Sequence, residues 1–108
     1  MKLDISQVLK DFAGREIIDG DGRTKIRLGA LLVAVYQQRR DGSYDLLKKQ
    51  YEYCRKISAE LDKVAAGEEA ESLDFSIEEI ADMIRLLVAS QIPAQVKCPA
   101  LMALEKES

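Results

Sequence analysis

Residues 74–90, DFSIEEIADMIRLLVAS, carry the most complete structural signal in this chain of 108 residues. Ser76 and Glu79 have the spacing of a capping box, in which each side chain accepts a hydrogen bond from a backbone N–H that the first helical turn leaves unpaired. Apolar residues recur there at helical spacing and form one stripe: Ile77, Ile80, Ala81, Ile84, Leu87 and Val88. We therefore predict a core helix over about residues 76–91.

Two further helices are predicted before this one. Residues 28–40, LGALLVAVYQQRR, are apolar over most of the circumference of a helix, which is typical of burial in a core or in an oligomer contact. Residues 44–66 form the longest predicted helix, after a break in which Ser43 is a suitable N-cap. Its apolar stripe includes Cys54, so we expect that thiol to be buried and structural.

Turn signals lie toward both ends of the chain. The stretch Asp19-Gly20-Asp21-Gly22 separates two apolar-containing runs, which predicts a β-hairpin over about residues 15–28. The same stretch does not fit a calcium-binding loop, because Thr24 stands where that loop requires glycine. Near the C-terminus, Pro99 is expected to interrupt the helical pattern and to leave a short last helix over about residues 99–106.

The predicted fold class is mainly α: a small helical domain with an N-terminal β-hairpin, or α+β by strict count, with residues 1–108 in a single domain. We find no internal repeat, low-complexity segment or domain linker. No run approaches the roughly 18–20 apolar residues that span a bilayer, and the N-terminus lacks the apolar segment of a signal peptide. We therefore expect a cytoplasmic protein with no membrane partner.

The residues that most enzymatic chemistry needs are missing. The chain has no histidine, which is the commonest general acid–base group, and so it has no Ser-His or Cys-His pair. It has no glycine-rich phosphate loop and no dinucleotide fingerprint, and its two cysteines do not make a zinc site. We expect no catalytic, cofactor-binding or metal-binding residues, and no enzyme activity.

The charge is unevenly distributed along the chain. Residues 1–56 carry 12 basic and 8 acidic side chains, a net +4, whereas residues 57–108 carry 4 basic and 11 acidic, a net −7. One interpretation is that opposite charges meet across a folded domain or an oligomer contact. The other is a small nucleic-acid-associated regulator that binds phosphates through a basic patch, whose candidate residues are Arg23, Lys25, Arg27, Arg39 and Arg40.

Our leading interpretation of the apolar residues is that the protein acts through protein contacts, above all as a homo-oligomer. The helix over residues 28–40 is apolar over more surface than one neighbouring helix covers, and such a surplus usually marks an interaction site. The helix over residues 44–66 adds a stripe that rises about 34 Å. The candidate contact residues are Leu28, Leu31, Leu32, Val35, Tyr36, Leu47 and Tyr51.

Several motifs together resemble a group of small proteins encoded by tailed bacteriophages and prophages. They are Asp11-Phe12-x-Gly14-x-x-Ile17, Asp19-x-Asp21-Gly22, the alanine- and leucine-rich helix that follows, Ser76-Ile77-Glu78-Glu79-Ile80, and Pro93 leading into a closing Leu-Met-x-Leu-Glu. The group usually carries Thr-Leu-Gly at the start of the first helix, where this chain has Arg27-Leu28-Gly29 and lacks the capping hydroxyl.

This resemblance implies a phage-encoded helper and not a reaction. The expected role is that of an assembly helper, as tail-assembly chaperones are, or of a minor virion component; a host-modulating phage protein is an alternative. The expected location is then the cytoplasm of the host cell, with the virion as a second one.

Overall fold

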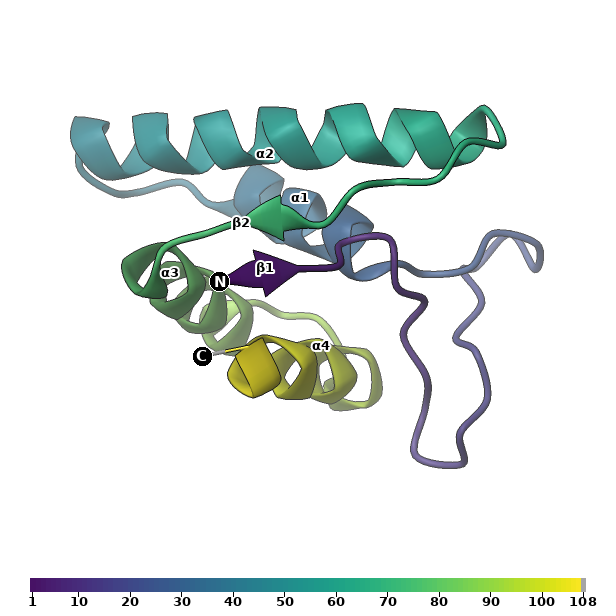
Figure 1. The fold of residues 1–108 in the computed structure, drawn as a ribbon. Helices are drawn as coiled ribbons and strands as arrows, with labels where there is room; N and C mark the ends of the chain where they lie inside the picture. The colour runs from purple at the N-terminus through teal and green to yellow at the C-terminus, as the bar shows by residue number, and fades with distance from the viewer. Residues whose placement is uncertain (108) are drawn as a thin grey trace.

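Four helices and one two-stranded antiparallel sheet make up the computed structural model, which describes residues 1–107 (Figure 1). The fold is mainly α, as predicted. The helices are α1 (Leu28–Gln38), α2 (Tyr44–Ala65), α3 (Ile77–Ala89) and α4 (Ala94–Glu107), and the strands are β1 (Lys2–Leu3) and β2 (Leu73–Asp74).

The elements form layers around one core. Figure 1 shows α2 along one side of the molecule and α3 and α4 on the opposite side, with α1 and the β1–β2 pair between them. Helix α1 packs on both α2 and α3, and α3 packs on α4. The largest fully buried side chains come from every one of these layers: Leu3, Ile5, Leu28, Leu32, Tyr53, Ile57, Ile80, Met83, Leu87 and Leu104.

The predicted start of α3 is confirmed. The backbone N–H of Glu79 donates to Ser76 Oγ at 3.1 Å, and the backbone N–H of Ser76 donates to Glu79 Oε1 at 2.9 Å, so the capping box is complete. The helix ends at Ala89, two residues before the predicted end, and the backbone is extended at Ser90.

Replacing Ser76 with alanine should lower the free energy of unfolding by roughly 0.5–2 kcal/mol, because the first turn of α3 loses a hydrogen-bond acceptor. Chemical denaturation measures the change. Ser58→Ala is the matched control, since Ser58 is exposed inside α2 and caps nothing. An unchanged midpoint for the Ser76 variant would contradict a helix start at this residue.

Helix α1 begins without a side-chain cap, as its missing hydroxyl predicts. The N-terminal segment supplies the acceptors instead: the backbone N–H of Leu28 donates to Gln7 O at 2.9 Å, and that of Gly29 donates to Ile5 O at 2.8 Å. The side chain of Arg27 adds a hydrogen bond from Nη1 to Ser6 O at 2.7 Å. The start of α1 is thus determined by a contact between segments more than 20 residues apart.

Residues 7–27, which we call the arm, differ from the predicted hairpin over residues 15–28. The chain turns between Ile18 and Lys25, which form an isolated bridge, but a third segment joins them. The backbone N–H of Leu9 donates to Ile26 O, that of Ile26 to Ile17 O, and that of Ile17 to Leu9 O, each at 2.9 Å. Among residues 1–107 the arm contains isolated bridges and no regular strand, and the sheet lies instead between β1 and β2.

The arm contains an internal repeat that we did not find in the sequence. Asp-x-x-Gly-Arg occurs as DFAGR at residues 11–15 and as DGDGR at residues 19–23, and each copy forms a turn. In both, the backbone N–H of the glycine donates to the carbonyl of the aspartate at 2.9 Å. Both glycines have positive φ, +80° and +74°, which glycine adopts without strain.

Helix α4 is longer than predicted. It starts directly after Pro93 and continues through Pro99 to Glu107, so the prediction that Pro99 interrupts it was wrong. A proline inside a helix removes one backbone hydrogen bond. Packing opposes this loss, because Ala100 and Leu104 are fully buried on the side of α4 that faces the core.

Glu60 ties the C-terminal half of α2 to the segment before β2. Its carboxylate accepts a hydrogen bond from Lys63 Nζ at 3.0 Å and another from the backbone N–H of Glu71 at 3.2 Å. The bond from Lys63, followed by that from Glu71, lowers the pKa of the Glu60 carboxyl below its usual range.

Because folding favours the ionised form of Glu60, its stabilising effect is present above the pKa of the unfolded chain, about 4.3 for glutamate, and is lost as pH falls through the lower folded-state pKa. Glu60→Gln should therefore be less stable than the parent protein at pH 7, and the difference should narrow below about pH 4. Thermal unfolding across this pH range measures it. The control is Glu52→Gln, at an exposed position of the same helix, which should stay close to the parent throughout. A stability difference between Glu60→Gln and the parent protein that stays constant with pH would contradict a stabilising role for the ionised Glu60 carboxylate.

Candidate functional site

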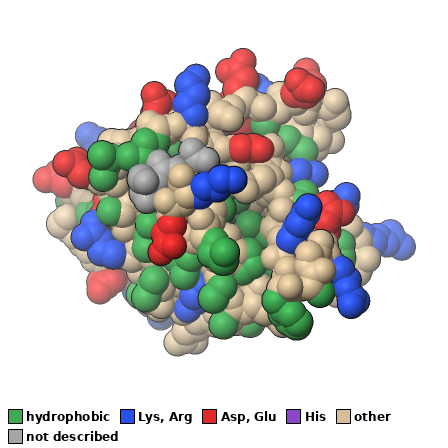
Figure 2. Space-filling view, turned by 60° about the horizontal axis from the view of Figure 1, so that its bottom comes forward, with side chains coloured by type: hydrophobic (Ala, Val, Ile, Leu, Met, Phe, Trp, Pro, Cys, Tyr) green, Lys and Arg blue, Asp and Glu red, His purple; other side chains and the backbone are tan. Residues whose placement is uncertain are grey.

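The main candidate site is an apolar groove of about 720 Å³ between the arm and α4, which we call the arm–α4 groove. Figure 2 shows the molecule from this side, with hydrophobic side chains gathered in the lower middle of the view and charged side chains around them. The arm and α4 supply the apolar lining: Val8, Leu9 and Phe12 from the arm, and Cys98, Pro99, Met102 and Ala103 from α4.

Phe12 is the most exposed large hydrophobic side chain of the described residues, at 94%. It lies in the first Asp-x-x-Gly-Arg turn, which is held by hydrogen bonds from the backbone N–H groups of Ala13 and Arg15 to Asp11 Oδ1, at 2.9 and 3.0 Å. A turn fixed in this way loses little conformational freedom when its phenylalanine binds something. Burying a phenylalanine side chain stabilises a complex by about 1.5–3 kcal/mol, and the isolated chain does not use this free energy.

Two other features of the groove suit a protein partner. Met102 is 69% exposed and lies in the same lining as Phe12, and methionine adapts to irregular partner surfaces. Lys10 and Lys106 also belong to the lining, and both are exposed. The remaining charge, that of Asp11, is already engaged by the backbone of its own turn. The groove therefore favours an apolar segment with acidic flanks.

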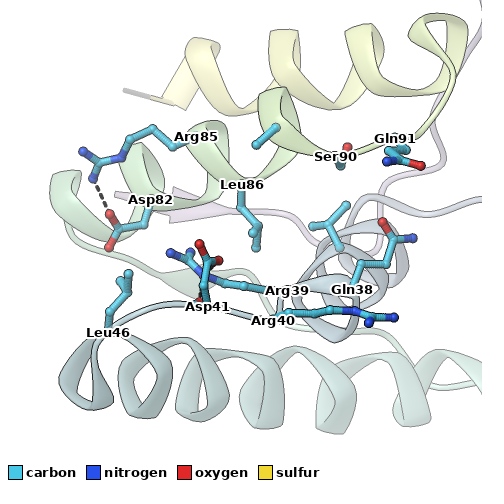
Figure 3. A pocket seen from close by; sticks show the side chains of 12 residues that line it. Gln38, Arg39, Arg40, Asp41, Leu46, Asp82, Arg85, Leu86, Ser90 and Gln91 are labelled. Atoms are coloured by element: carbon cyan, nitrogen blue, oxygen red, sulfur yellow. Dashed lines mark hydrogen bonds and ion pairs between the residues drawn. The ribbon is translucent and has the colours of Figure 1, made fainter.

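A second cavity, of about 940 Å³, lies between the end of α1, the start of α2 and α3 and is largely polar (Figure 3). Arg39 Nε donates to Asp41 O at 2.6 Å, and Arg85 is paired with Asp82. Figure 3 shows the guanidinium groups of Arg39, Arg40 and Arg85 at separate places and not around a common point. We assign no ligand to this cavity.

The predicted basic patch is divided in the structure. Arg23 and Lys25 lie in the arm, Arg27 directly precedes α1, and Arg39 and Arg40 follow its end. The 11 residues of α1 separate the two groups, and a helix of that length rises about 16 Å. The five side chains therefore do not form one phosphate-binding face, which weakens the nucleic-acid alternative.

The predicted oligomer contacts are also divided. Leu28, Leu31, Leu32 and Val35 are buried inside their own chain, because α2, α3 and the N-terminal segment cover α1. They are therefore not available to a second copy, and the apolar surface that we expected on α1 is already covered. Of the predicted set, Tyr36 and Leu47 are half-buried and Tyr51 is 54% exposed; Tyr36 and Tyr51 line a shallow groove of about 380 Å³ between α1 and α2.

The titratable and metal-binding side chains form no catalytic arrangement in the described part of the chain. Cys54 is buried, as predicted, and burial raises the pKa of its thiol to about 11, whereas Cys98 is exposed. Among the side chains that the structure describes, residues 1–106, no group of three acidic or cysteine side chains is placed to hold a metal ion. Within the same residues, no helix has both the length and the apolar character to cross a membrane.

No protein-family model, curated protein or solved structure matches this chain. The candidate site therefore depends on its geometry alone. No pattern in the sequence gave Phe12 a contact role or indicated the arm–α4 groove. The repeat would have identified the turn, because Asp-x-x-Gly twice in 12 residues places Phe12 at an exposed turn position.

Proposed function

We propose that this chain is a small, non-enzymatic, phage-type protein that acts through protein–protein contacts, as an assembly helper or a minor virion component in the host cytoplasm. The observation that carries the proposal is Phe12, held 94% exposed by a hydrogen-bonded turn beside an apolar groove. A host-modulating role would use the same surface.

Folding does not account for this arrangement. An isolated exposed apolar residue is ordinary, but here Phe12 and Met102 share one concave lining with five further apolar side chains. Exposed apolar patches that polar residues surround mark interaction sites in soluble proteins. Aromatic residues near the centre of such sites contribute most of the binding free energy.

The groove also indicates what kind of partner binds. It is open and elongated along α4, which suits an extended or helical segment of another protein. The exposed amino groups of Lys10 and Lys106 favour acidic residues beside the apolar ones in that segment. Assembly helpers bind other phage proteins before these are incorporated, and a groove for one apolar segment suits this task.

Phe12→Ser is the direct test. The products of the genes that adjoin this one should be co-expressed with the chain, and the affinity of any stable complex measured by calorimetry. Loss of a central aromatic contact should weaken binding at least about 30-fold, the equivalent of 2 kcal/mol. The unfolding free energy should stay within about 0.5 kcal/mol of the parent value, because the side chain is exposed.

Tyr44→Ser is the matched control for this test. Tyr44 is another exposed aromatic residue, at 74%, but it lies at the start of α2, away from the arm–α4 groove. Its replacement should leave the affinity unchanged. If the Phe12→Ser variant and the parent protein bind the partner with equal affinity, the partner uses another surface and the proposal for the groove fails.

A further inference from the structure

Helix α3 has a second apolar stripe that the core does not use fully. Ile77, Ala81, Ile84 and Val88 follow one another at intervals of four, three and four residues, which places them on one side of the helix. Ile77 is 66% and Val88 61% exposed, and the two between them are half-buried. The side chains that α3 buries fully are different ones: Ile80, Met83 and Leu87.

The spacing of this outer stripe is the same from either end. An identical helix that runs antiparallel therefore matches it, with Ile77 opposite Val88 of the second copy and Ala81 opposite Ile84 of the second copy. Small and large side chains then alternate along the contact, as they do where helices pack closely. The capping box already fixes the start of α3, so docking costs this helix little conformational entropy.

The charges beside the stripe have the same symmetry. Glu78 and Arg85 flank one edge of it, are seven residues apart and carry opposite charge. In the antiparallel arrangement each Glu78 lies beside Arg85 of the other copy, displaced by two residues, about 3 Å along the helix axis. Because the dimer has a two-fold axis, the Glu78–Arg85 pair occurs twice, once at each end of the contact.

Both side chains are exposed enough to reach a second copy. Glu78 is 86% exposed as a side chain and lies 4.0 Å from Lys49, at the limit of an ion pair. Arg85 is 72% exposed and is paired with Asp82 of its own helix, whose side chain is 16% exposed. A guanidinium group has five N–H donors, so Arg85 can keep this pair and also donate to Glu78 of the second copy.

We propose that a second copy of this chain docks antiparallel on the outer stripe of α3 and forms a two-fold dimer through Ile77, Val88 and two Glu78–Arg85 ion pairs. This inference is independent of the arm–α4 groove, because none of the stripe residues lines that groove. The contact uses one stripe of four apolar side chains from each copy, which is a small interface, so we expect dissociation constants in the micromolar range.

Sedimentation equilibrium of the full chain between about 5 and 200 μM brackets this affinity range and should show a monomer–dimer equilibrium. Val88→Asp should leave only monomer, because two carboxylates would enter the apolar contact. Phe12→Ser should leave the equilibrium unchanged, since Phe12 lies in the arm. A parent protein that is monomeric throughout, or a dimer that Phe12→Ser dissociates, would overturn the proposal.

Charge reversal tests the orientation of the two copies. Glu78→Arg and Arg85→Glu each place like charges together twice, and each should raise the dissociation constant about tenfold. The double variant restores opposite charges and should return it to within about threefold of the parent value. Circular dichroism checks that each variant keeps its helix content. If the double variant dimerises no better than the single ones, the antiparallel pairing is wrong.

Discussion

Replacing Ile57 with alanine is expected to lower the free energy of unfolding by about 2–5 kcal/mol, the range for large-to-small changes in a packed core. Ile57 is fully buried on α2. It is also the side chain closest to Gly29 of α1, where its Cγ2 lies 2.8 Å from the position that a Cβ would take. Truncation therefore leaves a cavity where α1, α2 and the N-terminal segment meet.

Urea denaturation measures this loss, and Ile77→Ala is the matched control. Ile77 is the same residue type in another helix but is 66% exposed, so its truncation removes little buried surface. We expect the control to stay within about 0.5 kcal/mol of the parent protein at low protein concentration. Equal losses at the two positions would show that Ile57 is not a packed core residue.

Gly29→Val should be the second strongly destabilising change, by about 1–3 kcal/mol or more. Gly29 does not need a positive φ; it is required because the chain passes too close for a side chain. A Cβ there would lie 3.0 Å from Ile5 O and 3.1 Å from Ile5 Cβ, in addition to its contact with Ile57. The isopropyl group of valine would also disturb the hydrogen bond from Gly29 N–H to Ile5 O, which helps to start α1.

Gly20→Val controls for the substitution itself. Gly20 has no heavy atom within 4 Å of its Cβ position and lies in the second turn of the arm, so the new side chain would enter solvent. Thermal unfolding compares the two variants. Combining Gly29→Val with Ile57→Ala should cost less than the sum of the single changes, because the cavity from one accommodates part of the other. Additive losses would contradict direct packing between the two residues.

Local signals in the sequence determine where α2 and α3 begin. The start of α3 follows from Ser76 and Glu79, and that of α2 from Ser43, whose hydroxyl accepts a hydrogen bond from the N–H of Leu46 at 3.3 Å. Such caps are made within four residues and need no tertiary contact. The mainly α fold class follows in the same way, from apolar periodicity along each segment.

Tertiary structure decided which apolar residues are covered and which remain available for contacts. The sequence made residues 28–40 the best candidate for an oligomer contact, yet α2, α3 and the N-terminal segment bury Leu28, Leu31 and Leu32. The spacing of apolar residues shows that one side of a helix is apolar, but it does not show which other segments of the chain cover that side. The exposed apolar surface therefore comes from other residues: Phe12, to which no pattern in the sequence gave a contact role, and Ile77 and Val88, which the spacing placed on the core stripe of α3.

Long-range contacts also determine the helices and strands whose position or length the local sequence patterns predicted incorrectly. The β1–β2 sheet joins residues at least 70 positions apart, and no spacing within either two-residue strand predicts that pairing. Helix α4 continues through Pro99 because burial of Ala100 and Leu104 offsets the lost hydrogen bond. The sequence alone thus determines the starts of α2 and α3 and the turn at residues 19–22, where a few neighbouring groups satisfy one another. Only the packed chain determines the exposed surface, because exposure depends on every segment that folds back against it.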